Sequence, residues 1–157
     1  MPKTSAGLLV YRRTGDDLEV LLVHPGGPFW QNKDEGAWSI PKGEIDDPSE
    51  EPLGVAAREF EEEIGVAPPD VTDAIALGEI RQSSGKRVLA WAIEGDLDVT
   101  EIHSNTFEAE WPPRSGRMRD FPEVDRARWF DPATARRKLL RGQAAFVERL
   151  LESLAAR

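Results

Sequence analysis

Glutamate residues crowd the stretch Arg58–Gly65, which reads REFEEEIG. On an α-helix, with about 100° between successive residues, Glu59, Glu62 and Glu63 fall within an arc of about 100°, and Glu61 falls on the opposite side. Carboxylates without histidine or cysteine form a hard-oxygen set that suits Mg²⁺ or Mn²⁺. The spacing therefore predicts a divalent-cation site on one face of a helix.

The same cluster is unfavourable for an isolated helix. Like charges at i,i+3 and i,i+4 destabilise a helix by roughly 0.2–0.5 kcal/mol per pair, and acids in the last turn oppose the helix dipole by about 0.3–1 kcal/mol each. Residues 44–63 hold nine acids and one base, Arg58. A solvated charged face is the alternative interpretation, but it leaves both costs in place, whereas a bound cation reverses their sign.

Composition limits the classes of protein that the chain can belong to. The net charge is −9, but outside residues 44–63 the 20 acids nearly balance 19 bases, which argues against a broad nucleic-acid-binding surface. The absence of cysteine excludes disulfides, zinc-thiolate sites and a cysteine nucleophile. The two histidines, His24 and His103, lie far apart, and we expect them at the surface or at strand ends.

The length of 157 residues fits one domain with its own core. The apolar run at residues 6–11 is too short for a signal peptide or a membrane span, so we expect a soluble, cytoplasmic protein without a membrane partner.

The order of elements predicts an α/β fold with a mixed sheet covered by helices on both sides. A helix should begin at Pro52, because proline suits the first helical turn, and end at Gly65. We expect a second helix over 131–142, an amphipathic helix from Gln143, and loops over 25–36 and 112–122. The expected strands are Thr4–Arg12, Leu18–His24, Trp38–Ile40, Ile75–Arg81, Val88–Glu94, Thr106–Trp111 and Arg126–Phe130.

Residues 43–66, GEIDDPSEEPLGVAAREFEEEIGV, resemble the signature box of the Nudix hydrolases. The spacing departs once, since six residues rather than five separate the first glycine from the first glutamate. The flanking WSIPKGE and FPEVDRARWF also resemble Nudix enzymes, the former those that act on dinucleoside polyphosphates. The residues that match the box are Gly43, Glu50, Arg58, Glu59, Phe60, Glu62, Glu63, Gly65 and Val66.

The resemblance implies a Nudix α/β/α sandwich over residues 1–157 and metal-dependent hydrolysis of a phosphoanhydride bond in a nucleoside diphosphate linked to another group. Glu62 and Glu63 would be the principal metal ligands, and Glu59 a ligand or the general base. Arg58 would pair with Glu50. The structural members of the motif would be Gly43, Glu50, Arg58 and Gly65.

Other residues are candidates for the metal or the substrate. By resemblance, the carbonyl of Lys42 is a further metal-ligand candidate and its side chain a phosphate ligand. The distant carboxylates Glu108, Glu110 and Glu123 are candidates for a fourth ligand, although each reads more simply as a solvent-facing acid.

The loop WPPRSGRMRDFP supplies further substrate candidates. Its arginines suit a phosphate clamp, and a solvated loop is an equal alternative. The loop arginines are Arg114, Arg117 and Arg119. The tryptophans that could stack on a base are Trp30, Trp38 and Trp111, although tryptophan more often lies in a core or an interface.

The predicted function is therefore a Mg²⁺- or Mn²⁺-dependent Nudix pyrophosphohydrolase. A dinucleoside polyphosphate is the favoured substrate, with a nucleoside triphosphate as the nearest alternative. A Nudix-like domain that senses a nucleotide without cleaving it is the alternative from another class. The retention of Glu59, Glu62 and Glu63 argues against that alternative. The sequence leaves the oligomeric state open.

Overall fold

A mixed six-stranded sheet forms the centre of the protein in the computed structural model, which describes residues 3–157. The strands run in the order β4-β5-β1-β2-β8, and β3 pairs with β1. β1 is parallel to β5, and the other pairs are antiparallel. The strands are β1 (Thr4–Thr14), β2 (Asp17–Pro25), β3 (Lys42–Glu44), β4 (Ile75–Arg81), β5 (Arg87–Glu94) and β8 (Val124–Phe130).

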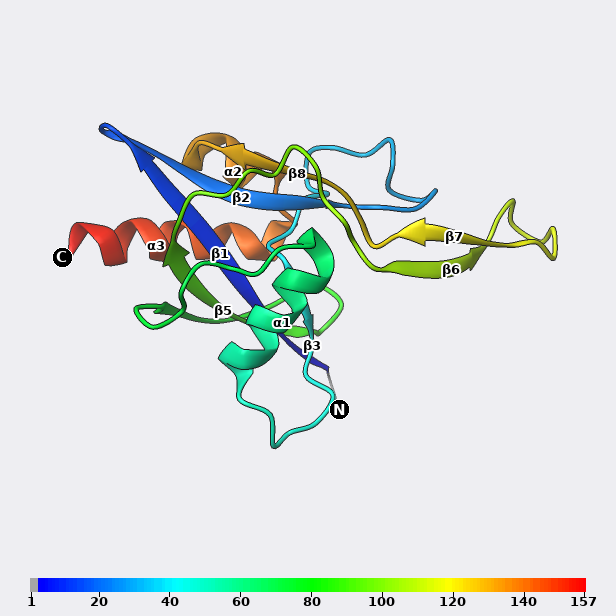
Figure 1. Ribbon diagram of the computed structural model, residues 1–157, viewed down its shortest axis with the longest axis horizontal. Helices are drawn as coiled ribbons and strands as arrows, with labels where there is room; N and C mark the ends of the chain where they lie inside the picture. Colours follow the sequence, from blue (N-terminus) through cyan, green and yellow to red (C-terminus); the bar gives the residue numbers. More distant parts are fainter. Residues whose placement is uncertain (1–2) are drawn as a thin grey trace.

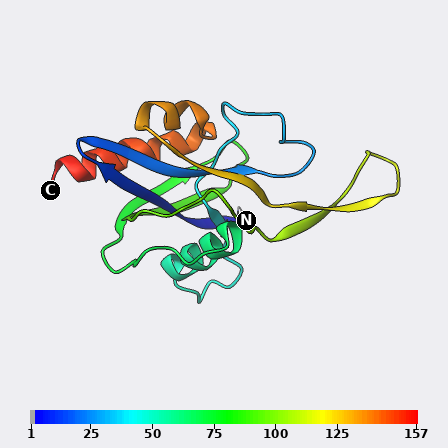
Figure 2. The same ribbon diagram turned by 45° about the horizontal axis from the view of Figure 1, so that its top comes forward.

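The central strand β1 is apolar on both faces because both faces are covered. Leu8 and Val10 point toward the cluster that includes Phe60 of α1 (Pro52–Ile64), while Leu9 points toward the cluster that includes Phe146 of α3 (Ala144–Ala155). A short helix, α2 (Pro132–Lys138), packs on the same side as α3 (Figure 2). The prediction of a mixed sheet between helices is confirmed. Residues 1 and 2 of the predicted domain lie outside the described residues.

Strands β6 (Thr106–Glu110) and β7 (Met118–Pro122) form a separate two-stranded ribbon. Residues 106–122, called the arm below, project away from the central sheet in both views (Figures 1 and 2). The prediction of a loop over 112–122 is wrong for β7. Its residues MRDFP are all exposed or half-buried, so they lack the apolar alternation that marks a strand on a core.

Two further expectations differ from the structure. Of the strand expected at Trp38–Ile40, Trp38 and Ser39 form only isolated bridges and Ile40 forms none. The helix expected over 131–142 ends at Lys138, because Leu139 is extended and buried beside Trp38, and a 3₁₀ turn follows at Arg141–Gln143. None of the helices in residues 3–157 has the length and apolar character needed to cross a membrane.

Candidate active site

Helix α1 begins at Pro52 and ends at Ile64, as the sequence predicted. It buries Phe60 and Ile64 against the sheet and leaves Glu61 exposed. Glu59 and Glu62 lie half-buried at the edge of this face. Glu63 is different, because only 8% of it is exposed. The carboxylates therefore occupy one side of the helix and reach from solvent into the protein.

Burial raises the pKa of Glu63 to about 8. The backbone N–H of Lys42 donates to Glu63 Oε2 at 3.2 Å and opposes this shift. Burial lowers the pKa of the Lys42 amine, with the charge of Glu63 opposing it. The structure thus places the side chain of Lys42 close enough to Glu63 for their charges to interact.

Gly43 gives Glu59 room to lie against β3. A Cβ at residue 43 would stand 2.0 Å from Glu59 Cδ, so the Glu59 carboxylate would have to move away from β3. Burial raises the pKa of Glu59, and the nearby charge of Glu62 adds to the increase. The lack of a side chain at the first glycine of the box therefore allows the strand to approach the carboxylate.

The other members of the box hold its geometry. Arg58 Nη1 donates to Glu50 Oε2 at 2.6 Å, so the additional residue in the preceding loop does not prevent this ion pair. Gly65 adopts φ 94° and its N–H donates to the carbonyl of Glu61, which closes the helix.

A distant segment brings Glu123 to the same end of α1. The N–H of Asn105 donates to the carbonyl of Glu62 at 3.0 Å, and the N–H of Glu123 donates to the carbonyl of Asn105 at 2.8 Å. Burial raises the pKa of Glu123, and the charge of Glu62 adds to it. Of the three predicted fourth carboxylates, the structure brings this one to the box, whereas Glu108 and Glu110 lie out on the arm.

A cavity of about 190 Å³ opens beside these carboxylates. Its walls are mainly aliphatic, with the indole of Trp30 on one side. Trp38 is instead buried in the core, and Trp111 lies in the arm with its ring 5.7 Å from that of Phe29. The cavity is lined by Val23, Pro25, Trp30, Ala37, Ser39, Ile40, Lys42, Glu63, Glu123, Val124 and Leu140.

The arm carries the predicted phosphate-binding arginines away from the carboxylates. Arg114 and Arg117 lie in the turn between β6 and β7, at the far end of the arm (Figure 1). The structure does not bring them near the box of their own chain.

The sequence did not lead us to predict that His24 is buried. It lies near the end of β2, as expected, but it is completely buried. Its Nδ1 lies 2.9 Å from Asp125 Oδ1, and its Nε2 lies 2.6 Å from the carbonyl of Lys33. The apolar residues before it, LLV, were the available signal for burial. His24 ties the loop that carries Trp30 to β8.

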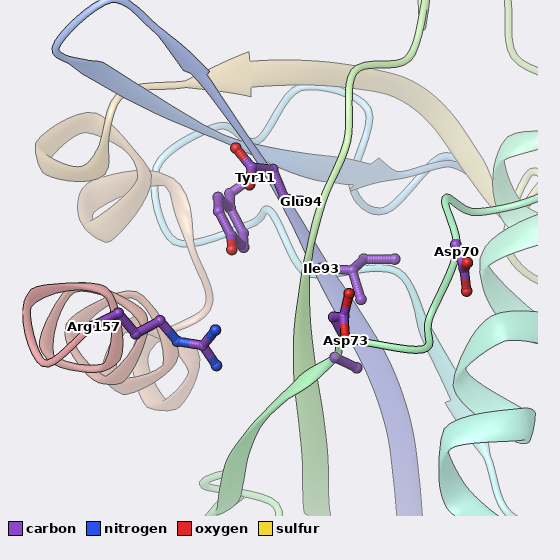
Figure 3. Close-up of a pocket in the computed structure, with 7 residues that line it drawn as sticks. Tyr11, Asp70, Asp73, Ile93, Glu94 and Arg157 are labelled. Atoms are coloured by element: carbon purple, nitrogen blue, oxygen red, sulfur yellow. The ribbon is translucent and has the colours of Figure 1, made fainter.

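Another cavity, of about 670 Å³, lies away from the box and collects the carboxylates of Asp70, Asp73 and Glu94 near Tyr11 and Arg157 (Figure 3). The hydroxyl of Thr72 donates to Asp70 and lowers the pKa of that carboxyl. This cavity is polar and lacks the buried carboxylate with a raised pKa found at Glu63. The buried carboxylate therefore favours the smaller cavity, beside Glu63, as the candidate active site.

Within residues 3–157 no three acidic or imidazole side chains stand in an arrangement already converged on one metal ion. The carboxylates of the box lie on one helix side but do not meet at a point.

Comparison with known proteins identifies the family of the chain. A family model described as a NUDIX domain matches residues 1–150. No curated protein matches the sequence.

Three solved structures illustrate the likeness of fold. The binary complex of a C. elegans Ap4A hydrolase is 20% identical with a TM-score of 0.68, covering 98% of this chain and 99% of that one. The NUDIX domain of Shewanella oneidensis NrtR complexed with ADP ribose is 18% identical with a TM-score of 0.67, covering 98% and 89%. The MutT protein from Methanosarcina mazei Go1 is 20% identical with a TM-score of 0.60, covering 98% and 96%. The prediction of a Nudix pyrophosphohydrolase is confirmed at the level of the family, and the chain belongs to the Nudix family.

Proposed function

We propose that the protein hydrolyses a phosphoanhydride bond in a nucleoside diphosphate linked to another group, with Mg²⁺ or Mn²⁺ as cofactor. The observation that carries the proposal is Glu63, a nearly buried carboxyl whose pKa is raised to about 8, on the same helix side as Glu59 and Glu62. A charged carboxylate at this depth needs a compensating cation.

The donor set fits a divalent metal ion of the hard class. All side-chain donors at the box are carboxylate oxygens, and neither histidine of the chain is among them. Glu59, Glu62 and Glu63 would hold the metal, with Glu123 as the fourth carboxylate and the carbonyl of Lys42 as a further ligand. When bound, the metal would neutralise the diphosphate and acidify the attacking water.

The chain's own residues would bind the substrate and move the proton. Lys42 lines the cavity beside Glu63, and we infer that its amine binds a phosphate oxygen there. A carboxylate with a raised pKa is a stronger base at neutral pH, which suits Glu59 to accept the proton of the attacking water when it is not a metal ligand. The side chain of Arg58 is engaged with Glu50 and would serve the geometry of the loop rather than the chemistry.

The apolar cavity would receive the nucleoside part of the substrate. Its walls include Trp30, Ile40 and Leu140, and a flat base suits such a surface. We propose a dinucleoside polyphosphate as substrate, with a nucleoside triphosphate as the alternative. The likeness in fold to a C. elegans Ap4A hydrolase and to a Methanosarcina mazei MutT protein is consistent with both.

The test is product analysis with Mg²⁺ and a panel of dinucleoside polyphosphates, nucleoside triphosphates, nucleotide sugars and diphosphoinositol phosphates. Glu62→Gln and Glu63→Gln should each lower kcat by at least about 100-fold, since each removes a charge that the transition state needs. Glu61→Gln is the matched control, because Glu61 is exposed on the opposite side of α1, and it should retain full activity. Unchanged turnover in the first two variants would contradict the proposal, and binding without turnover by the wild type would favour the sensing alternative.

A further inference from the structure

The arm is poorly supported by its own chain. A two-stranded ribbon is marginally stable in water unless something packs on it. The loop before Gln31 covers part of it, since the Phe107 ring contacts the space above Gly27 and Phe29 meets Trp111. Met118 nevertheless remains 57% exposed and Phe107 36% exposed. By the register of β6 and β7, Phe107 lies on the face of the ribbon that meets this loop and Met118 lies on the opposite face, so the exposed apolar side chain of the arm is on the face away from the loop.

Charge is distributed unevenly along the arm. Residues 111–119 contain Arg114, Arg117 and Arg119 and no acid. Within residues 3–157 none of these arginines forms an ion pair. The base of the arm has the opposite charge, because Asn105 and Glu123 adjoin the carboxylates of α1.

Within one chain, the arginines at the tip of the arm cannot reach the carboxylates at its base. Asn105 and Trp111 are separated by six residues along an extended strand, which is about 20 Å at roughly 3.4 Å per residue. An arginine side chain at the tip is too short to cover that distance back to the box.

A second copy of the chain would cover the exposed arm and would bring carboxylates to the arginines at its tip. When two arms pack side by side and antiparallel, each tip lies at the base of the other arm, so arginines face the carboxylate site. A parallel arrangement would place arginines against arginines and is disfavoured by their charge. The antiparallel arrangement has twofold symmetry, the commonest symmetry of protein dimers.

We propose that the protein forms a dimer through antiparallel packing of the arms, in which Arg114 and Arg117 of one copy bind substrate phosphates at the carboxylate site of the other. The second half of this proposal rests on the proposed hydrolase function. The dimer itself does not, and it can be tested without activity.

The dimer is tested by sedimentation and by cross-linking. The wild type should sediment as a dimer at tens of micromolar, and Arg114→Ala with Arg117→Ala should weaken the dimer at least about tenfold. Because the chain contains no cysteine, introduced cysteines report specific contacts. A mixture of Asn105→Cys and Ser115→Cys chains should oxidise to a species of twice the mass. Asp16→Cys, in the turn at the opposite end of the molecule, should not cross-link to Ser115→Cys (Figure 1).

The contribution of the arginines in trans is tested by complementation. One chain carries Glu62→Gln and Glu63→Gln, and the other carries Arg114→Ala and Arg117→Ala. Each should be nearly inactive alone, whereas co-expressed chains should regain about a quarter of wild-type activity, because half of the dimers contain one complete site. A monomer in sedimentation overturns the dimer. A dimer whose mixed chains give only the sum of their separate activities overturns the role in trans.

Discussion

At the scale of the residue, the role proposed for Glu63 conflicts with the stability of the folded protein. Its folded-state pKa of about 8 lies above the ordinary value of 4.5, so the folded protein binds the proton more tightly than the unfolded chain. The stabilising contribution of the proton is therefore complete below about pH 4.5 and is lost as the pH rises through about 8. The burial of this residue costs a few kcal/mol at high pH when no cation is bound, and the proposed cation would offset that cost.

Glu63→Gln should therefore stabilise the metal-free protein at pH 8 by about 1–3 kcal/mol, because it removes the buried charge while an oxygen remains to accept from the N–H of Lys42. Urea unfolding with a chelator, at pH 5 and pH 8, measures the effect. The gain should shrink at pH 5. The exposed Glu61→Gln should change stability by less than about 0.5 kcal/mol at either pH. Equal pH dependence in wild type and Glu63→Gln would contradict the assignment.

A bound divalent metal ion should stabilise the folded protein more as the pH rises, whereas the proton on Glu63 stabilises it less. Millimolar Mg²⁺ or Mn²⁺ should raise the Tm of the wild type more at pH 8 than at pH 5.5, since a proton on Glu63 competes with the ion. Differential scanning fluorimetry measures the shift, and Glu63→Gln is the control that should lose most of it. A metal-induced shift that is the same at both pH values would argue against Glu63 as a ligand.

At the scale of the element, α1 depends on its C-terminal cap. Gly65 lies at φ 94°, and a Cβ there would stand 2.8 Å from His103 Cβ and 2.9 Å from the His103 carbonyl oxygen. The same segment continues to Asn105, whose N–H binds the carbonyl of Glu62. The cap therefore positions the helix end and also the segment between β7 and β8 that carries Glu123.

Gly65→Ala should lower the free energy of unfolding by more than about 2 kcal/mol, through left-handed strain and the contact with His103. Gly15→Ala is the matched control, because Gly15 also has a positive φ, 66°, but nothing lies within 4 Å of its Cβ position. It should cost only about 1 kcal/mol. Equal losses in denaturant titrations would show that the contact with His103 contributes nothing.

At the scale of the whole molecule, Gln143 joins three segments beneath the cavity. It is fully buried, accepts from the N–H of Ile40 at 2.9 Å, and donates to Ser39 Oγ at 3.0 Å and to Gln82 Oε1 at 3.2 Å. Ser39 and Ile40 line the cavity. One side chain after α2 therefore fixes the wall of the site from about 100 residues away in the sequence.

Gln143→Leu should lower the free energy of unfolding by about 2 kcal/mol, because the N–H of Ile40 is left buried without an acceptor. Urea unfolding measures this loss. Substrate KM should rise as well, since Ser39 and Ile40 form part of the cavity wall. Gln31→Ala, at an exposed loop position, is the control and should alter stability by less than about 0.5 kcal/mol. A stable Gln143→Leu variant would indicate that another group satisfies Ile40.

The sequence by itself determined the helices and strands that depend on residues close together in the chain. Pro52 and Gly65 define α1 through backbone constraints, and the spacing of its glutamates places three carboxylates on one side of the helix. The apolar runs of β1 and β2 mark strands covered on both faces. These features depend on residues a few positions apart, so their pattern is visible in the chain.

Only the tertiary structure decided which residues from distant parts of the sequence lie beside these helices and strands. The position of Glu123 beside the box, with Glu108 and Glu110 on the arm, depends on the hydrogen bonds through Asn105. The setting of His24 depends on a loop carbonyl and on β8. The strand β7 exists through pairing with β6 rather than through its own apolar pattern. Such contacts join residues far apart in the sequence, and no local propensity or periodicity encodes them.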